Sequence, residues 1–401
     1  MAKYLIIGNG VAGNTAAEAI RQQDPAGEII MFSKEPHPFY YVPALPEFVA
    51  GERELKRLII HDAAWYEKNR IELHLETTVT AIEPVQKVVV TDKGGPYAYD
   101  KLLLATGGTS FVPPIKGADL EGVFTLRTMG DAEKLKGRAQ TSRQAVLIGG
   151  GLLGLEAGNG LRKAGLKVTV VEFFPRLLPR QMDGPGAALL QAQLEELGFS
   201  FHLGTTTREI TREADGLKVH LESGVVLGAE LVLISAGVRP ELTLARSLGL
   251  AIDKGVKVDD RMHTGVDDIF AAGDLIEHRG RFYGIWPAAM EQGRVAGANL
   301  AGQEARYEGT AVSNTLKVVG IDLFAAGEID VEGALEASVS KDEARKIYRK
   351  LVVTDGVLVG AILLGDIRGS NEIQQAIKAK KDVSAFKADL AEANFDFNRL
   401  K

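Results

Sequence analysis

The sequence contains no cysteine. Without a thiol, the chain cannot form a disulfide, offer a thiolate nucleophile or supply cysteine ligands to zinc or to an iron–sulfur cluster. Histidine is scarce, and no pair shows the HxH or HExxH spacing of a metal site. We therefore expect no metal, and only structural or surface roles for His37, His61, His74, His202, His220, His263 and His278. Any redox chemistry must depend on a bound cofactor.

Long apolar segments are absent as well. The longest uncharged apolar stretches cover eleven residues, 145–155, and nine residues, 357–365, whereas a membrane-spanning helix needs about 20. The chain opens directly on a strand pattern, MAKYLIIGNG, rather than on a basic leader with a cleavable apolar segment. Its net charge of −6 provides no general attraction to nucleic acid or to an anionic membrane. We expect a cytoplasmic protein with neither kind of partner.

Glycine, in contrast, is abundant, at 45 of 401 residues, and its placement reveals a repeat. Each copy predicts a strand, a G-x-G-x-x-G turn, a helix and a second strand. The first glycine permits the sharp turn, the second leaves room for a pyrophosphate, and the third lets helix and strand pack closely. The helix N-terminus then offers free N–H groups to the phosphates. Two dinucleotide sites are predicted, at strand 4–7, turn 8–13 and strand 28–32, and at strand 145–148, turn 149–154 and strand 167–171.

The two copies differ in the acidic residue expected about 20 residues later, where it would bind a ribose hydroxyl. In the second copy Glu172 lies 18 residues after Gly154, at the strand end. A carboxylate there accepts a hydrogen bond from a free 2′-hydroxyl and repels a 2′-phosphate, which favours NADH over NADPH, although Arg176 and Arg180 nearby weaken that preference. In the first copy the candidates for the ribose contact are Ser33, Lys34 and Glu35.

Further strands follow each copy. The runs LLLATGG at 102–108 and LVLISAG at 231–237 end in small residues, and DIFAAGD at 268–274 repeats this form with an aspartate at the strand tip. From about Tyr307 the pattern changes to antiparallel strands within 312–329, 344–355 and 357–365, and then to a helix over 371–381. This predicts a smaller α+β domain at the C-terminal end.

Together these motifs resemble the FAD-dependent pyridine nucleotide–disulfide oxidoreductase superfamily over nearly the whole chain. Within it, the sequence is most similar to the NADH:rubredoxin oxidoreductases and to the flavin-binding part of assimilatory nitrite reductases. The stretches that carry this likeness are LLPRQMD at 177–183, GVRP at 237–240, YGIWP at 283–287 and TLKVVG at 315–320. The resemblance implies an α/β fold of two doubly wound, Rossmann-like domains and a C-terminal α+β domain. The implied ranges are 1–112 with 240–306 for FAD, 113–239 for NAD, and 307–401.

The resemblance also implies which residues bind the cofactors. FAD would lie on the first glycine turn, the first strand end and the later strand tips, with Trp286 and Pro287 beside the isoalloxazine ring. NADH would lie on the second turn, with Glu172 on its ribose and Glu156 near the nicotinamide; a carboxylate favoured by the helix dipole explains Glu156 equally well. The FAD set is Gly8, Gly10, Val11, Ala12, Gly13, Ser33, Lys34, Glu35, Val79, Ala105, Thr106, Gly107, Arg127, Gly273, Asp274, Trp286 and Pro287. The NAD set is Gly149, Gly151, Leu152, Leu153, Gly154, Glu156, Glu172 and Gly237.

Departures from the superfamily pattern reduce the number of activities that this chain could have. The disulfide reductases carry a cysteine pair and the peroxidase and coenzyme A disulfide reductase branches carry one cysteine, so this chain has none of these activities. Val42 stands where many relatives have an arginine, and Glu47 where ferredoxin-reductase relatives have a lysine. We therefore expect the protein contacts to the flavin pyrophosphate and to the N5 edge of the ring to differ from those in these relatives.

The expected function is electron transfer between NADH and a one-electron protein carrier. A flavin takes up a hydride and releases single electrons, so no catalytic acid or base is needed. The carrier would be a rubredoxin, a ferredoxin or an iron–sulfur subunit, and the chain would act alone, as a homodimer or within a larger redox enzyme. Two alternatives stay open: an NADH oxidase or diaphorase, and a non-catalytic redox-responsive binding protein. A quinone reductase is disfavoured, because 371–381 offers only Ile373, Ala376 and Ile377 as an apolar stripe.

The C-terminal domain suggests where the carrier binds. Residues 341–381 contain nine basic and five acidic residues, a local charge of +4. We expect an ordinary solvated surface there; the more specific hypothesis is a basic face that steers an acidic carrier. The aromatic residues of the tail, Phe386, Phe395 and Phe397, are expected to pack against the domain rather than to form a docking motif.

Overall fold

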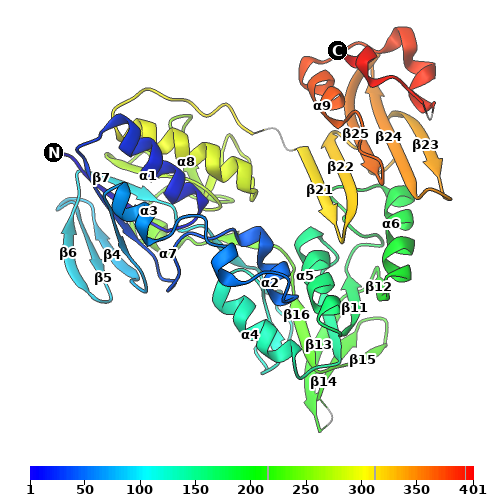
Figure 1. The fold of residues 1–401 in the computed structure, drawn as a ribbon, viewed down its shortest axis with the longest axis horizontal. Coiled ribbons are helices and arrows are strands. Elements are labelled where there is room, and N and C mark those ends of the chain that lie inside the picture. The colour runs from blue at the N-terminus through cyan, green and yellow to red at the C-terminus, as the bar shows by residue number, and fades with distance from the viewer. Residues whose placement is uncertain (215, 311–312, 393) are drawn as a thin grey trace.

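The computed structural model describes residues 1–214, 216–310, 313–392 and 394–401. Figure 1 shows three lobes, each built around its own sheet, with the N-terminus in the first and the C-terminus in the third. The five-stranded sheets of the first two lobes are parallel, and that of the third is antiparallel. The predicted fold class, two doubly wound units followed by an α+β unit, is confirmed.

The first lobe places the strands of the first glycine repeat side by side. β1 pairs with β2 from Lys3 opposite Glu28 to Ile7 opposite Phe32, and both apolar runs are buried, as in a sheet covered on both faces. The strand order is β19-β7-β1-β2-β3. These strands are β1 (Lys3–Ile7), β2 (Glu28–Phe32), β3 (Ile71–His74), β7 (Lys101–Leu104) and β19 (Ile269–Ala271).

Smaller elements complete this lobe. They are a three-stranded antiparallel sheet of β4 (Val79–Glu83), β5 (Val88–Thr91) and β6 (Gly94–Ala98), the pair β18 (Val256–Val258) and β20 (Ile276–His278), and the helices α3 (Ala63–Lys68) and α7 (Thr243–Ser247).

Two helices of the first lobe, α1 (Val11–Gln23) and α8 (Trp286–Leu300), pack unusually closely. A Cβ on Gly293 would lie 2.3 Å from the carbonyl oxygen of Ala12, and one on Gly297 would lie 2.4 Å from that of Ala16. Real Cβ atoms do not approach backbone that closely. Glycine at these two positions therefore brings a helix from residue 286 onward against the N-terminal helix, beside the first glycine turn (Figure 1).

The second lobe repeats the arrangement with the second glycine repeat. Its strand order is β12-β11-β10-β16-β9, all parallel. These strands are β9 (Val123–Phe124), β10 (Gln144–Ile148), β11 (Lys167–Glu172), β12 (Phe199–Leu203) and β16 (Leu231–Ile234). The other elements are α4 (Met129–Ala139), α5 (Leu152–Lys163), α6 (Gly184–Glu196) and the antiparallel β13 (Thr207–Glu213), β14 (Gly216–Leu221) and β15 (Val226–Ala229).

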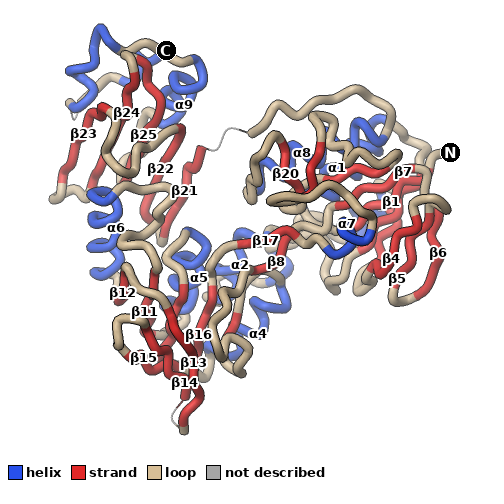
Figure 2. The backbone as a smooth tube through the Cα atoms, turned by 180° about the vertical axis from the view of Figure 1, so that it is seen from behind, coloured by secondary structure: helices blue, strands red, loops and turns tan. Residues whose placement is uncertain are grey.

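The chain passes between the first two lobes through a two-stranded antiparallel ribbon, visible between them in Figure 2. It consists of β8 (Gly108–Ser110) and β17 (Val238–Pro240). A second link is the short helix α2 (Leu45–Val49), which follows the first-lobe strand β2 and packs on α5 of the second lobe. A Cβ on Gly160 of α5 would lie 2.6 Å from the carbonyl oxygen of Pro46, so the two lobes touch here through backbone.

The third lobe packs against the second through one shared apolar core. A buried polar group lies within this contact: the Tyr348 hydroxyl donates to Asp183 Oδ2 at 2.6 Å, and Lys350 Nζ lies 3.4 Å from carboxylate oxygens of both Asp183 and Asp330. The sheet order is β21-β22-β25-β24-β23. The elements are β21 (Ser313–Val318), β22 (Ile321–Gly327), β23 (Glu336–Asp342), β24 (Ile347–Thr354), β25 (Val357–Leu364) and α9 (Ser370–Ala379).

One feature of the third lobe differs from the sequence-based prediction. β23, with the sequence EASVSKD, has no apolar run because it is an exposed edge strand, and it was not predicted. The predicted antiparallel strands within 312–329 begin outside the described residues, and from 313 they form the antiparallel hairpin of β21 and β22. The tail aromatics do pack as predicted: Phe386, Phe395 and Phe397 contact one another against the sheet core.

The proposed basic face of this lobe is reduced by burial. Arg349 and Lys350 are only 8% and 4% exposed, because they bind groups inside the lobe or at its contact with the second lobe. Three other cations pair with nearby carboxylates: Lys341 with Glu343, Lys346 with Glu196, and Arg368 with Asp366. The sequence count therefore overstates the free positive charge. Within the described ranges, no helix is both long and apolar enough to cross a membrane.

We expect Gly297→Ala to destabilise the protein by about 2 kcal/mol, because its methyl group would collide with the backbone of Ala16. Gly137→Ala in α4 is the matched control: no atom lies within 4 Å of its Cβ, so the better helix propensity of alanine should stabilise by about 0.5–1 kcal/mol. Urea unfolding of both variants measures the difference. Equal effects would contradict close α1–α8 packing as the reason for the glycine.

Candidate functional site

The first glycine turn combines two packed glycines with an open one. Gly8 has a φ of +119°, and a Cβ there would lie 2.0 Å from the carbonyl oxygen of Ala105. A Cβ on Gly13 would lie 2.0 Å from the carbonyl oxygen of Gly8. Around Gly10, however, a Cβ would meet no atom within 4 Å. The turn is therefore in close contact with backbone at its first and third glycines and has open space beside its second.

The open side faces the N-terminus of α1. This helix end has no side-chain cap and no acidic residue in its first turn, so its N–H groups and positive dipole end are free for an anion. An uncapped helix start with open space at the second glycine fits a nucleotide pyrophosphate. This is the arrangement that the G-x-G-x-x-G spacing predicts.

The second glycine turn has the same geometry. Gly149 has a φ of +117° with its Cβ position 2.2 Å from the carbonyl oxygen of Ser235, and that of Gly154 is 2.4 Å from the carbonyl oxygen of Gly149. Gly151 is open, and α5 begins without a side-chain cap or an acidic residue in its first turn. Leu152 and Leu153 form that first turn. Two equivalent open helix starts therefore lie at two different sheets.

At the end of β11, the carboxylate of Glu172 is held beside the second turn. Its Oε2 accepts a hydrogen bond from the Gly150 amide at 2.5 Å, and its Oε1 accepts one from the Phe174 amide at 2.9 Å. The side chain is 7% exposed. Both oxygens keep a free lone pair, so the carboxylate can also accept from a ribose hydroxyl. Gly237, with a φ of +110°, follows the neighbouring strand β16.

The corresponding residues of the first lobe are arranged differently. The buried Ser33 hydroxyl accepts from the Glu35 amide at 3.2 Å, and Glu35 Oε2 accepts from the Tyr40 hydroxyl at 2.7 Å. Lys34 is exposed. Val79 is buried, two residues after Thr77, whose amide donates to the Ser33 carbonyl. The three ribose candidates and Val79 thus lie around one strand end, with Glu35 already bound to a tyrosine.

An ion pair connects residues from both lobes next to the first turn. Arg127, just before α4, lies 2.6 Å from Asp274 Oδ2 through its guanidinium and donates through Nε to the carbonyl of Gly108 at 3.2 Å. Asp274 follows Gly273 at the tip of β19. Ala105, Thr106 and Gly107 follow β7 directly, and the Ala105 amide donates to the carbonyl of Ile7, beside Gly8.

Aromatic side chains surround the start of α8, where Trp286 and Pro287 are the first two residues. The ring of Trp286 stacks on Phe39 at 5.7 Å between centroids and meets the edge of Tyr41 at 5.0 Å. Tyr41 is 40% exposed. This group presents a partly exposed aromatic surface at a helix N-terminus, which suits a planar ring system.

Glu156 lies in α5, but the structure ties it to the third lobe. Its Oε1 accepts a hydrogen bond at 2.8 Å from the amide of Val319, in the turn between β21 and β22. Burial raises the pKa of this carboxyl, and the negative charge of Glu47 adds to the increase, while the Val319 hydrogen bond and Lys163 oppose it. The residue therefore links α5 to the third lobe, in addition to any contact with a nicotinamide.

A buried network behind the first turn was not predicted from the sequence. The Tyr66 hydroxyl lies 2.8 Å from the side-chain oxygens of both Asn9 and Asn14, and Asn14 Nδ2 donates to the carbonyls of Asn9 and Gly10. Burial raises the pKa of Tyr66 to about 12. His61 joins through Nδ1, 3.2 Å from Asn14 Oδ1. Only the polar Asn14 inside an apolar helix face could have indicated it.

Metal ligation has no geometric support in the part of the chain that the structure describes, because no three His, Asp or Glu side chains converge there.

We expect Glu156→Gln to flatten the pH dependence of stability. The folded-state pKa lies above the usual 4.5, so the folded chain binds this proton more tightly than the unfolded chain. The resulting stability is present below about pH 4.5 and is lost as the pH rises through the folded-state pKa. Glutamine keeps an acceptor for Val319 without the charge. Urea unfolding across this pH range should show a smaller loss in the variant; parallel curves would contradict the assignment.

Comparison with known proteins agrees with this geometry. The pyridine nucleotide-disulphide oxidoreductase family profile matches residues 2–293, and that of the rubredoxin NAD+ reductase C-terminal domain matches residues 313–381. The NAD(P)H nitrite reductase of Bacillus subtilis is 36% identical over 95% of this chain, which spans only 48% of that protein. The NADH-rubredoxin oxidoreductase of Clostridium acetobutylicum is 30% identical over 94% of this chain and 95% of its own.

A solved structure shares the three-lobed fold. It is the ferredoxin reductase for the CYP199A2 system of Rhodopseudomonas palustris, with a TM-score of 0.90, 25% identity and coverage of 100% of this chain and 99% of its own. The chain spans about half or less of the length of several curated relatives that it matches. The first family profile alone covers well over half of the chain. The chain therefore belongs to the pyridine nucleotide-disulphide oxidoreductase family, whose members bind FAD and NAD(H), and it contains no cysteine.

Proposed function

We propose that this chain passes electrons between NADH and a one-electron protein carrier of rubredoxin or other iron–sulfur type, through bound FAD. The observation that carries the proposal is a pair of equivalent dinucleotide turns in a chain without cysteine. With no thiol to receive electrons from the flavin, they must leave for an external acceptor. The names of the rubredoxin oxidoreductase and ferredoxin reductase relatives support a carrier with an iron–sulfur or rubredoxin-type centre.

The first lobe would hold FAD and the second NADH, with domains at 1–112 and 240–306, 113–239, and 307–401; residues 307–310 of the last range lie against the first lobe. The β8–β17 ribbon lies next to both proposed crossing points, which supports this division. Gly10 and the start of α1 would bind the FAD pyrophosphate, while Asp274, held by Arg127, would contact the ribityl region. When bound, FAD accepts a hydride at N5 and releases electrons one at a time.

The residues of this chain would orient the two cofactors rather than transfer protons. Trp286 and Tyr41 would border the flavin ring and exclude water from its edge. Gly151 and the start of α5 would bind the NADH pyrophosphate, and Glu172 would accept a hydrogen bond from the ribose 2′-hydroxyl. A 2′-phosphate would bring negative charge against this buried carboxylate, so we propose a preference for NADH.

The length comparison suggests a setting for this activity. Because the chain spans about half of the nitrite reductase relative, we propose that the same electron-transfer unit works either with a separate carrier or as a flavin module in a larger redox enzyme. Its third lobe, which matches the rubredoxin reductase C-terminal domain, would contribute to carrier docking.

Anaerobic titration with NADH tests the proposal. We expect the FAD-loaded protein to lose its visible flavin absorbance on NADH addition and to be reoxidised by rubredoxin or ferredoxin faster than by oxygen. The kcat/KM for NADH should exceed that for NADPH by at least about tenfold, since like charges oppose the 2′-phosphate. Faster turnover with oxygen than with every carrier would favour an NADH oxidase instead, and equal rates with both nucleotides would refute the proposed preference.

Two alanine substitutions should separate the two cofactor sites. Gly10→Ala adds a methyl group into the space in front of α1, where no protein atom lies within 4 Å. The apoprotein should stay within about 0.5 kcal/mol of the wild type, while FAD affinity falls by about tenfold or more because the methyl group meets the pyrophosphate. Gly151→Ala is the matched control: FAD binding stays unchanged and the KM for NADH rises. Calorimetric titration and steady-state kinetics distinguish the two patterns, and loss of FAD in both variants would contradict the assignment.

A further inference from the structure

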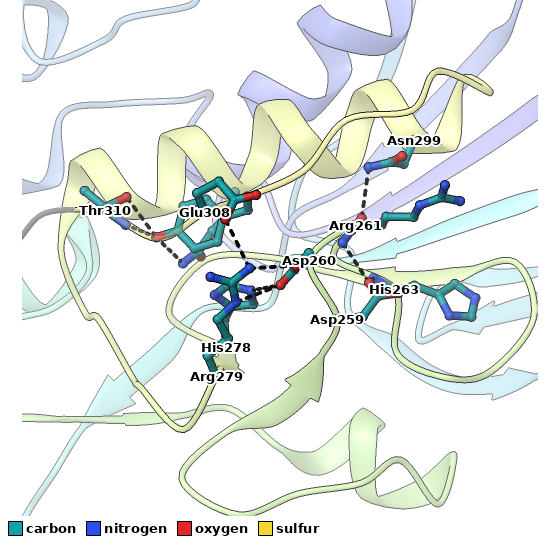
Figure 3. Close-up of polar contacts among 11 residues, drawn as sticks. Asp259, Asp260, Arg261, His263, His278, Arg279, Asn299, Glu308 and Thr310 are labelled. Carbon is teal, nitrogen blue, oxygen red and sulfur yellow. Dashed lines mark hydrogen bonds and ion pairs between the residues drawn. The ribbon is translucent and has the colours of Figure 1, made fainter.

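The segment from residue 302 to residue 310, here named the strap, leads from the end of α8 towards the third lobe. It has no regular secondary structure, yet it is bound to the first lobe along its length; Figure 3 shows one of these contacts, between Glu308 and Arg279. Asn299 exchanges hydrogen bonds with the backbone of Ala305, and the Tyr307 amide donates to the carbonyl of Asp260 at 2.7 Å. Further contacts join Arg261 to Glu304, Arg279 to Glu308, and Thr310 to Glu291.

Tyr307 is the buried centre of the strap, with 0% of its surface exposed. Its hydroxyl lies 2.8 Å from Thr310 Oγ1 and accepts from the Thr310 amide at 3.0 Å. Its ring packs against His278 at 4.9 Å between centroids. Burial raises the pKa of this phenol, so it remains a neutral hydroxyl at physiological pH. A fully buried tyrosine with a satisfied hydroxyl holds an irregular segment more firmly than surface ion pairs do.

Tyr307 packs on a group of charged and polar side chains centred on Asp260. The Asp260 carboxylate receives two hydrogen bonds from Arg279, at 2.9 and 2.7 Å, and lies 2.9 Å from His278 Nε2 (Figure 3). These contacts lower the pKa of Asp260 to about 2, with the Arg279 hydrogen bond as the largest cause. His278 is 1% exposed. The strap therefore packs on first-lobe side chains that are held in place by hydrogen bonds to one another.

Gln292 of α8 connects the strap to the Asp274 loop. It is 1% exposed, and its Oε1 accepts from the Gly273 amide at 3.0 Å while its Nε2 faces the Tyr307 hydroxyl at 3.4 Å. The Gly273 amide can only donate, so the side-chain oxygen must face it and the NH₂ group must face Tyr307. Gly273 is followed by Asp274, which pairs with Arg127. A continuous series of contacts thus runs from the strap to Asp274.

We propose that Gln292 and Tyr307 are positioning residues of the flavin site, through which the strap holds the Gly273–Asp274 loop in place. The inference rests on the proposed function, because it takes Asp274 to contact FAD. Gly273 has a φ of +84° and its Cβ position lies 3.0 Å from the Ala12 side chain, so the loop is already confined on the α1 side. Gln292 confines it on the other side. The segment leading to the third lobe is then part of the cofactor site.

Tyr307→Phe tests this directly, because it keeps the buried ring and removes only the hydroxyl. We expect the Kd for FAD to rise by roughly three- to tenfold, as one buried hydrogen-bonded group is lost, and the flavin absorption spectrum and midpoint potential to shift. Tyr99→Phe is the matched control, since Tyr99 is a buried tyrosine of the same lobe whose hydroxyl has no hydrogen-bond partner in the described structure. It should change none of these three quantities.

A double-mutant cycle with Gln292→Leu tests whether Tyr307 acts through Gln292. If it does, adding Tyr307→Phe to Gln292→Leu changes the Kd for FAD much less than it does in the wild type. Additive effects, or a Tyr307→Phe variant that loses thermal stability while its FAD Kd, spectrum and potential stay at wild-type values, would overturn the inference alone. A wild-type chain that binds no FAD would overturn the proposed function, and this inference with it.

Discussion

Both glycine turns depend on how closely one stretch of backbone can approach another. At Gly8 and Gly149 the chain leaves a strand at positive φ. Each glycine lies against a carbonyl at the end of the neighbouring strand in its sheet, and any Cβ would collide with that carbonyl. Only this approach places the helix N-terminus at the sheet edge with its N–H groups free. The later close contacts, α8 on α1 and α2 on α5, also depend on glycine and bring distant segments against the helices that follow the two turns.

The parts of the fold that local chemistry determines were predictable. Strands, turns and helices around Gly8 and Gly149 follow from a repeated spacing, and Glu172 lies at its strand end as the spacing requires. The edge strand β23 was missed because an exposed strand needs no apolar alternation. The ion pair of Arg127 with Asp274 joins residues 147 positions apart, and their pairing is a tertiary contact that no local spacing reveals.

Polar side chains behind the site were the least predictable. Tyr66 and Gln292 are separated in sequence from the groups they bind. Asn14 binds the nearby carbonyls of Asn9 and Gly10, but it is polar on a helix face where pattern alone predicts apolar packing. The local charge counted over 341–381 overstated the charge on the surface for the same reason. Arg349 and Lys350 contribute to that count, but in the fold they donate hydrogen bonds to buried oxygens. Such residues are paired when buried, and the partner is set by topology.

The shared core between the second and third lobes has a consequence for how the molecule can be divided. Tyr348 and Lys350 of the third sheet meet Asp183 at the start of α6, amid apolar side chains from both lobes. Cutting the gene before the third sheet would remove the Tyr348 and Lys350 partners of Asp183, which would keep only its contact with the Gly186 amide, and would expose an apolar surface on the second lobe. The last ninety residues are therefore not structurally independent of the second lobe. They share an apolar core with the second lobe, so we expect the stability of each lobe to depend on the other.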